Sequence, residues 1–215
     1  MKLNTPMKVC KICFKDIKEN SLLYLINPNL SLCKTCYNKL IPHFRTFKVD
    51  KYDGLAFYDY DEEIRALLYQ LKGCFDYELA LTFLDRYIQE IRLKYFGYII
   101  VPIPSYIKDD ERRGFNHVQE IFKILNLKTV NAIIKTDHFK QADNDHEKRK
   151  EISKHLQLVD GVDLSNKKVL LVDDVYSTGS TMKASIKLIE KLHPKKIKVL
   201  VMAKTNDEKY KKKED

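Results

Sequence analysis

Four cysteines near the start of the chain have the spacing of a metal site. They form two CxxC pairs, Cys10 with Cys13 and Cys33 with Cys36, separated by nineteen residues. Four-thiolate zinc sites use this spacing, because each pair directs two sulfurs to one point and the intervening chain, here with a turn at 27–29, brings the pairs together. Such a site leaves no coordination position open. We therefore expect a structural or partner-binding Zn²⁺ in preference to a redox role.

A second candidate site begins where the apolar run 169–172 ends. Asp173 and Asp174 follow that run directly. The turn and helix start that come next contain Tyr176, Ser177, Thr178, Gly179, Ser180 and Thr181. Backbone N–H groups, hydroxyls and a glycine suit a phosphate at the carboxyl end of a parallel strand, and two carboxylates can accept hydrogen bonds from sugar hydroxyls. The pattern favours a ribose 5-phosphate ligand. The alternative is an ordinary helix cap after a strand that ends in Asp.

The elements that must position these residues have the pattern of a mostly parallel sheet covered by helices. Uninterrupted apolar runs at 98–101, 169–172 and 199–202 predict strands that are buried on both faces, and 55–58 predicts a strand at the edge or the start of the sheet. Apolar residues spaced three and four apart predict the covering helices. These helices are expected around 64–71, 84–95, 115–125 and 182–189.

Length and composition indicate one main core with a small appendage. The chain has 215 residues, of which 44% are hydrophobic. We expect a zinc ribbon over residues 1–45, an α/β domain over 52–206 and a disordered tail over 207–215. The net charge of +9 is consistent with an anionic partner such as nucleic acid or a phosphorylated ligand, and equally with a lysine-rich solvated surface.

Two classes of protein are excluded on motifs. None of the six glycines lies in a GxxxxGK[ST] or GxGxxG pattern, which argues against a nucleotide-driven motor and against dinucleotide binding.

No run approaches the roughly 20 apolar residues of a membrane span, and the polar start of the chain lacks the apolar core of a signal peptide. We expect no membrane span and a cytoplasmic protein.

The segment 169–181 resembles the phosphoribosyl pyrophosphate (PRPP) signature of type I phosphoribosyltransferases. Together with the four cysteines it makes the chain similar to the ComF family, which consists of competence-associated phosphoribosyltransferase-like proteins. Further matches are Leu71-Lys72, residues 101–104, Arg113-Gly114-Phe115-Asn116 and Gln141. Two departures are Ser177, where the family often has Thr, and Arg149 to Ile152, which lacks the asparagine of an Arg-x-x-Asn element. The resemblance implies a type I phosphoribosyltransferase-like fold with an N-terminal zinc ribbon.

The resemblance also implies roles for individual residues. Ser105 and Tyr106, after the strand at 98–101, are expected to hold pyrophosphate through backbone groups. Asp173 and Asp174 are expected to orient the ribose and, in an active transferase, to act as catalytic residues that stabilise an oxocarbenium-like state, with Mg²⁺ held mainly by the ligand. Candidates for phosphate or DNA contacts are Lys108, Arg112, Arg113 and Arg149. Arg113 is alternatively a structural residue at a helix start, and 138–154 is either a mobile lid or a surface loop.

Two functions remain open from the sequence. The first is a PRPP-binding competence protein that handles imported single-stranded DNA with a ComFA-type helicase or other competence proteins. The second is an active phosphoribosyltransferase that transfers ribose 5-phosphate to a base or an amine and releases pyrophosphate. The zinc ribbon serves either nucleic acid binding or protein docking in the first function, and acts as a scaffold in the second.

Overall fold

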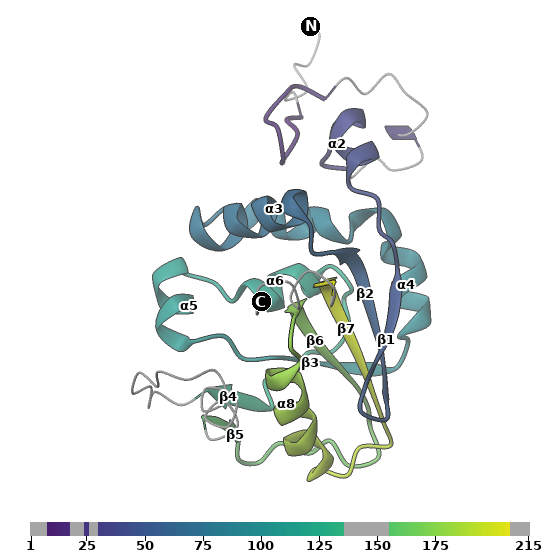
Figure 1. Ribbon diagram of the computed structural model, residues 1–215, viewed down its shortest axis with the longest axis vertical. Coiled ribbons are helices and arrows are strands. Elements are labelled where there is room, and N and C mark those ends of the chain that lie inside the picture. Colours follow the sequence, from purple (N-terminus) through teal and green to yellow (C-terminus); the bar gives the residue numbers. More distant parts are fainter. Residues whose placement is uncertain (1–7, 18–23, 26–29, 136–154, 207–215) are drawn as a thin grey trace, which may run out of the picture.

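The computed structural model describes residues 8–17, 24–25, 30–135 and 155–206 (Figure 1). Its centre is a five-stranded sheet with the order β1-β2-β7-β6-β3. The strands are β1 (Arg45–Val49), β2 (Tyr52–Asp59), β3 (Tyr98–Pro102), β6 (Lys168–Tyr176) and β7 (Lys196–Lys204). Strands β2, β7, β6 and β3 run parallel, and β1 forms an antiparallel hairpin with β2. The mostly parallel α/β sheet predicted from the sequence is confirmed.

The apolar runs form the strands for which they were predicted. In β6, Val169 and Leu171 face one side of the sheet, while Leu170 and Val172 face the other, and all four are fully buried. A strand that is covered on both faces needs such an uninterrupted run. The strand at 55–58 lies inside the sheet and not at its edge, because β1, which the sequence did not predict, pairs with its outer side.

One face of the sheet is covered by the helices that come before β3 and after it (Figure 1). They are α3 (Glu62–Gly73), the 3₁₀ segments η1 (Tyr77–Phe83) and η2 (Asp85–Tyr87), α4 (Ile88–Lys94) and α6 (His117–Lys123). The start of helix α3 is fixed by a side-chain cap, since the carboxylate of Asp61 accepts a hydrogen bond from the backbone N–H of Ile64 at 2.9 Å. The predicted helix at 84–95 is shorter than expected because its first part is 3₁₀.

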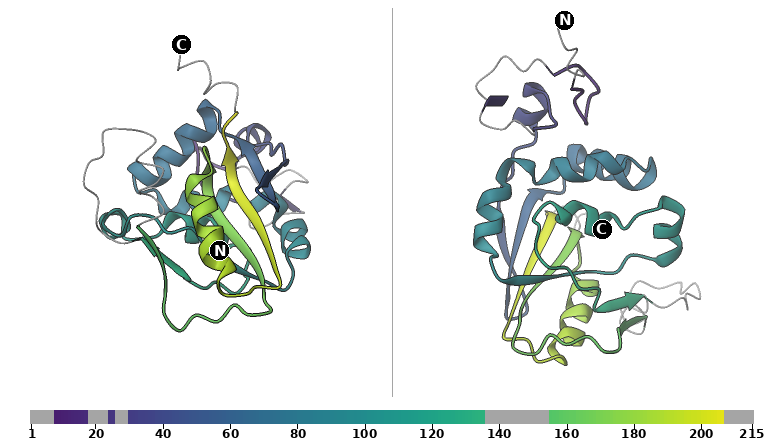
Figure 2. Two further views of the ribbon diagram at one scale, coloured as in Figure 1. Left: turned by 60° about the horizontal axis from the view of Figure 1, so that its bottom comes forward. Right: turned by 180° about the vertical axis from the view of Figure 1, so that it is seen from behind.

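The other face is covered by α8 (Ser180–Glu190) and by a small second sheet (Figure 2). Met182, Ile186 and Ile189 of α8 pack on this face as their spacing predicts. Strands β4 (Ile133–Lys135) and β5 (Leu156–Leu158) pair antiparallel beside it. The sequence did not predict this two-stranded sheet, since each of its strands has only three residues.

Two shorter helices complete the described chain, α2 (Lys34–Lys39) in the cysteine region and α5 (Ile107–Arg113) after β3. No helix of the described residues is long and apolar enough to cross a bilayer. Three expectations fall outside the described residues: the turn at 27–29, the segment 138–154 with Gln141 and Arg149, and the tail 207–215. The division into domains stays a prediction.

Candidate functional site

The two acidic residues lie near the carboxyl end of β6, on the side of the sheet where all the parallel strands end. Asp173 is paired in register with Val201 of β7, and Val172, the residue before it, pairs with Pro102 at the end of β3. The last turn of α3 and the start of α6 reach the same edge, because Lys72 and His117 both contact Asp174. Ligands of open α/β sheets bind at this edge.

Asp174 is held by the protein. Only 7% of the residue is exposed, and its Oδ2 forms an ion pair with Lys72. Nε2 of His117 lies 3.5 Å from the same oxygen. Asp174 is therefore not open to a ligand as the sequence pattern suggested for both acids: its side chain points inward toward α3 and α6, where it pairs with Lys72.

Asp173 is half-buried, whereas Asp174 is buried. Its Oδ1 accepts a hydrogen bond from the backbone N–H of Asp174 at 2.9 Å. Burial raises the pKa of Asp173 to about 7, and the charge of Lys72 opposes this rise. Burial likewise lowers the pKa of Lys72 to about 8, against the attraction of Asp173. Lys72 thus forms an ion pair with Asp174 and also attracts the charge of Asp173. The Asp173 carboxylate changes charge near neutral pH.

Arg113 lies inside the protein, with 7% of its side chain exposed. Its Nη1 donates to Nδ1 of His117 at 2.6 Å and lies 3.3 Å from Oδ1 of Asp110. Burial, with the nearby charges of Lys72 and Arg113, lowers the pKa of His117 far below its usual range. The imidazole is therefore neutral, and with Nδ1 as acceptor its proton is on Nε2, facing Asp174. These contacts favour the structural role for Arg113 over a phosphate contact.

The rest of the Arg113–Asn116 motif joins the loop after β3 to α6. Oδ1 of Asn116 accepts from the backbone N–H of Gln119 at 2.9 Å, which caps α6. Nδ2 of the same side chain donates to Oγ of Ser105 at 2.9 Å and to Oδ2 of Asp110 at 2.7 Å. The Ser105 hydroxyl is thereby used within the protein. That Ser105 and Tyr106 hold pyrophosphate through backbone groups stays a prediction.

The turn after β6 is open to solvent at Ser177 and Thr178, both exposed. Helix α8 starts at Ser180 without a side-chain cap and without an acidic residue in its first turn. The Thr178 and Ser180 hydroxyls lie 3.1 Å apart, and Thr181 is half-buried in the first turn. The Ser180 N–H makes only a long hydrogen bond of 3.5 Å, to the Thr178 hydroxyl. N–H groups and hydroxyls at a helix start are the features that favour an anion.

Gly179 is required by the shape of this turn. Its φ of +72° is left-handed, and a Cβ added there would lie 2.6 Å from Cζ of Tyr176. The Tyr176 ring is itself held by Phe47, with ring centroids 4.6 Å apart. Tyr176 therefore closes over the glycine backbone and fixes the turn. A direct contact of Tyr176 with PRPP stays a prediction.

The four cysteines of the CxxC pairs come together as their spacing predicts. Their sulfurs all lie within 4.8 Å of one another, and those of Cys13 and Cys33 are 3.6 Å apart. Tetrahedral zinc with Zn–S bonds of about 2.3 Å separates its sulfurs by about 3.8 Å. All five cysteines of the chain are free of disulfides. The cluster therefore has the donors and spacing to hold a metal ion such as zinc.

The electrostatics of the cluster favour a cation at its centre. Burial raises the pKa of Cys36, and the sulfurs of Cys13, Cys33 and Cys10 raise it further. Burial also acts on Cys10, but hydrogen bonds from the backbone of Cys33, Cys13 and Ile12 outweigh it and lower the pKa of Cys10 to about 7. Adjacent thiolates repel one another, and a divalent ion removes that repulsion.

The cysteine region is attached to the helices beneath it by charged side chains. Lys11 forms an ion pair with Glu78 of η1 at 2.6 Å. The Arg86 guanidinium of η2 lies 4.3 Å from the centroid of the Tyr37 ring of α2. A buried apolar cluster runs from Cys10 and Leu32 to Leu55 and the covering helices. The cysteine region thus shares a core with the sheet domain.

The sequence missed part of the network at the sheet edge. Lys72 enters the sequence analysis only through the family resemblance. His117 could not be recognised because its partner Asp174 is distant in the sequence. Asp110 could not be recognised because its pairing with Arg113, three residues later, is common in helices. Lys108 and Arg112 lie on the exposed part of α5, where the Arg112 guanidinium is 5.8 Å from the centroid of the Phe75 ring. Their phosphate or DNA contacts stay predictions.

Comparisons with known proteins agree with the resemblance seen in the sequence. Residues 111–215 match the family described as "Phosphoribosyl transferase domain". The chain is 25% identical over 149 residues to "Competence protein ComFC" of Streptococcus pneumoniae, covering 69% of this chain and 67% of that protein.

Similar solved structures include two phosphoribosyltransferases. The hypoxanthine enzyme of Staphylococcus aureus has a TM-score of 0.40 and 12% identity over 60% of this chain and 64% of its own, so less than two thirds of that enzyme is spanned. The hypoxanthine-guanine enzyme of Bacillus anthracis has a TM-score of 0.40 and 15% identity over 61% of this chain and 72% of its own. The domain match over residues 111–215, the ComFC relative, the mostly parallel sheet and the cysteine cluster make the chain similar to ComF proteins and to phosphoribosyltransferase domains.

Proposed function

We propose that this chain is a PRPP-binding competence protein that acts in natural transformation. The observation that carries the proposal is the juxtaposition of two features at the end of β6. One is the half-buried carboxylate of Asp173, and the other is the exposed turn of Ser177 and Thr178 at the uncapped start of α8. A sugar with a 5-phosphate offers hydroxyls to the first feature and an anion to the second.

In the proposed complex, the turn and Asp173 bind different parts of the ligand. The 5-phosphate accepts hydrogen bonds from the backbone and hydroxyls of residues 177–181, and Asp173 accepts hydrogen bonds from the ribose hydroxyls. Asp174 supports this arrangement from behind, since it is already paired with Lys72. Mg²⁺, held mainly by the pyrophosphate oxygens, would reduce the negative charge of the ligand near the two acids.

The wider role concerns imported DNA. We propose that the protein handles single-stranded DNA in the cytoplasm together with a ComFA-type helicase or other competence proteins. The relative in Streptococcus pneumoniae is named a competence protein, and the net charge of +9 suits a polyanion. The cysteine region, once loaded with zinc, provides a rigid surface for DNA or for the protein partner.

The DNA-binding part is tested by titrating a fluorescent oligothymidylate and measuring anisotropy at several salt concentrations. Contacts with phosphates predict that the logarithm of the affinity falls linearly with the logarithm of the salt concentration. Affinity that does not change between low and high salt would contradict phosphate contacts. Absence of binding at low salt would remove DNA handling from the proposal while leaving PRPP binding to its own test.

A second candidate function is an active phosphoribosyltransferase. It is favoured by the domain match and by a cavity of about 150 Å³ between the loop after β3 and β4, lined in part by Ser105, Asn116 and Asn131. The Asn131 amide nitrogen suits an acceptor on the polar edge of a base, whereas the Asn116 amide is already bonded within the protein. The reaction would break the bond between C1 of the ribose and pyrophosphate and form a bond from C1 to a nitrogen of the acceptor, which then loses a proton.

Pyrophosphate release in the presence of PRPP, Mg²⁺ and a panel of bases and amines separates the two functions. Release that depends on an acceptor, and the matching ribosylated product, would establish the transferase. Thermal stabilisation by PRPP and Mg²⁺ without release supports the binding protein. No stabilisation and no release would contradict both functions.

A further inference from the structure

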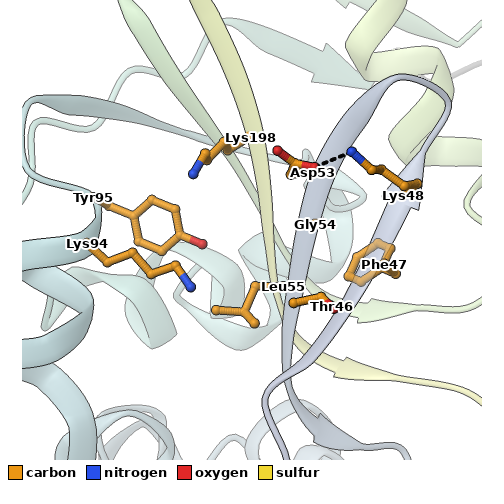
Figure 3. A pocket seen from close by; sticks show the side chains of 9 residues that line it. All are labelled: Thr46, Phe47, Lys48, Asp53, Gly54, Leu55, Lys94, Tyr95 and Lys198. Carbon is orange, nitrogen blue, oxygen red and sulfur yellow. Dashed lines mark hydrogen bonds and ion pairs between the residues drawn. The ribbon is translucent and has the colours of Figure 1, made fainter.

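A second recess lies at the opposite end of the sheet, where the parallel strands begin (Figure 3). Its volume is about 420 Å³. It is lined by Thr46, Phe47, Lys48, Asp53, Gly54, Leu55, Lys94, Tyr95 and Lys198. Lys198 pairs in register with Leu170 of β6, six residues before Tyr176, which is about 20 Å at the rise of a strand. The recess is therefore separate from the turn after β6.

A row of alternating charges crosses three strands at this recess. Lys48 of β1 pairs in register with Asp53 of β2 and forms an ion pair with it. Lys198 of β7 precedes Val199, the partner of Gly54, so it lies beside Asp53 on the next strand. The pKa of Asp53 is lowered, mainly by its hydrogen bond and charge interaction with Lys48 and further by Lys198. Asp53 is thus an ionised acceptor with a lysine on either side.

Two lysines of the recess form no ion pair within the described ranges, although Lys198 lies beside Asp53 on the neighbouring strand. Lys94 is the last residue of α4 and is exposed. Lys198 is half-buried on a strand face that continues with Leu200 and Met202, and its Nζ lies 6.0 Å from the centroid of the Tyr95 ring. A half-buried ammonium group next to apolar side chains is stabilised by an anion.

Tyr95 adds a hydroxyl donor to the wall of the same recess. Only 1% of this residue is exposed, and its ring packs edge-on against Tyr98 with centroids 5.7 Å apart. Its hydroxyl points into the recess between Lys94 and Lys198 (Figure 3). It has no hydrogen-bond partner in the part of the chain that the structure describes. A hydroxyl that faces an open recess and has no protein partner can donate to a ligand or to water.

We infer that this recess binds a small phosphorylated molecule of the nucleoside monophosphate class. The phosphoryl group would lie between the ammonium groups of Lys94 and Lys198 and accept a hydrogen bond from the Tyr95 hydroxyl. Asp53 would accept hydrogen bonds from a ligand hydroxyl or amino group. A small molecule is favoured over a nucleic acid strand because the Asp53 carboxylate repels a continuous row of phosphates. The inference does not rest on PRPP binding.

The test is calorimetric titration of 5′-AMP without Mg²⁺ into the full chain and into variants. Because AMP carries a ribose 5-phosphate, which the proposed function also places on the turn after β6, the recess is measured in a Ser177→Ala/Thr178→Val background. We expect one binding event there, about tenfold weaker when Lys94→Gln/Lys198→Met is added and about threefold weaker when Tyr95→Phe is added, which removes a single oxygen. Lys187→Met removes one exposed charge from α8 on the other face of the sheet and is expected to leave the affinity unchanged. Ser177→Ala/Thr178→Val alone, in the turn after β6, is expected to keep the binding event of the recess that the wild type shows.

Four results would overturn the inference. The first is no binding of AMP at millimolar concentration, and the second is an AMP affinity lowered as much in Lys187→Met as in the lysine variant. The third is loss of AMP binding in the turn variant with retention in the lysine variant. The fourth is binding of an oligothymidylate in the recess without binding of AMP. Circular dichroism establishes that each variant is folded, and Tyr95→Phe decides the question if the lysine variant is not. PRPP titrated into the lysine variant reports on the proposed function separately.

Discussion

Lys72 and Asp174 form an ion pair that joins the last turn of α3 to the end of β6. The same carboxylate oxygen faces the Nε2 proton of His117. One of the two acids is therefore committed to the protein, while its neighbour Asp173 is half-buried near the carboxyl end of β6. The acidic pair thus has two different tasks, a structural one for Asp174 and a ligand-facing one proposed for Asp173.

The first prediction concerns the lysine of this pair. Lys72→Met is expected to lower the free energy of unfolding by about 2 kcal/mol, because it leaves a buried carboxylate without its cation, while the partial exposure of Lys72 limits the loss. Urea unfolding measures it. Lys123→Met, which removes an exposed lysine paired with Glu120, serves as the control and is expected to change stability by less than about 0.5 kcal/mol.

Combining Lys72→Met with Asp174→Asn checks the cause. The double variant is expected to be less destabilised than the sum of the two single variants, since neither charge is then left unpaired. If the losses of stability in the two single variants simply add up in the double variant, the Lys72–Asp174 ion pair does not stabilise the contact between α3 and β6.

The second prediction separates the two neighbouring arginines of α5. Arg113→Met is expected to destabilise the protein by about 3 kcal/mol, because Asp110 and His117 lose a buried partner. Arg112→Met is the matched control, since Arg112 is exposed, and its effect is expected to be below about 0.5 kcal/mol. If Arg113→Met kept wild-type stability but bound PRPP more weakly, the ligand-contact role would be correct instead.

The third prediction concerns the turn after β6. Gly179→Ala and Gly161→Ala both place an alanine at a positive φ, of +72° and +77°, but only Gly179 faces a ring, that of Tyr176. Gly161→Ala is expected to cost about 1 kcal/mol for the left-handed backbone, and Gly179→Ala clearly more. Thermal unfolding measures both. Equal losses would mean that Tyr176 does not restrict the turn.

The fourth prediction concerns the cysteines. The protein purified without chelator is expected to contain one zinc ion per chain by elemental analysis, and Cys36→Ser to contain less and to unfold at a lower temperature. Cys74→Ala, at an exposed cysteine outside the cluster, is expected to keep both the zinc and the unfolding temperature. Zinc-free wild-type protein of unchanged stability would contradict a structural zinc site.

The fifth prediction is a pH dependence. Because the pKa of Asp173 is raised to about 7, its carboxylate gains its charge as the pH rises through neutrality. PRPP affinity is expected to increase over this range, and Asp173→Asn to flatten the increase. The stability of the free protein runs in the opposite direction: a raised acid pKa contributes stability at low pH that is lost as the pH rises to about 7. A steeper rise in PRPP affinity in Asp173→Asn would contradict the assignment.

The sequence predicts the parts of the fold that depend on local patterns. The runs at 98–101, 169–172 and 199–202 become central strands because burial on both faces demands uninterrupted apolar residues, and the CxxC pairs converge because their spacing is dictated by tetrahedral coordination. Strand β1 was missed because its side chains alternate between exposed and half-buried, and β4 and β5 because three residues carry no periodicity.

The sequence predicts only the part of the site whose residues are neighbours in the chain. The turn from Tyr176 to Thr181 is contiguous, so its residue types indicate its chemistry. The burial of Asp174 depends on Lys72, about 100 residues earlier in the chain, and on His117, whose tautomer is fixed by Arg113. No pattern in the sequence shows which of two adjacent acids turns inward, because that follows from the position of α3 and α6 against β6.

The most direct test of the account is a calorimetric titration of PRPP with Mg²⁺ into the wild type, Asp173→Asn and the control Asp163→Asn, an exposed loop acid. The account predicts binding in the wild type and in Asp163→Asn, and affinity lowered by about tenfold or more in Asp173→Asn. Absence of binding in the wild type, or the same affinity in Asp173→Asn, would contradict it.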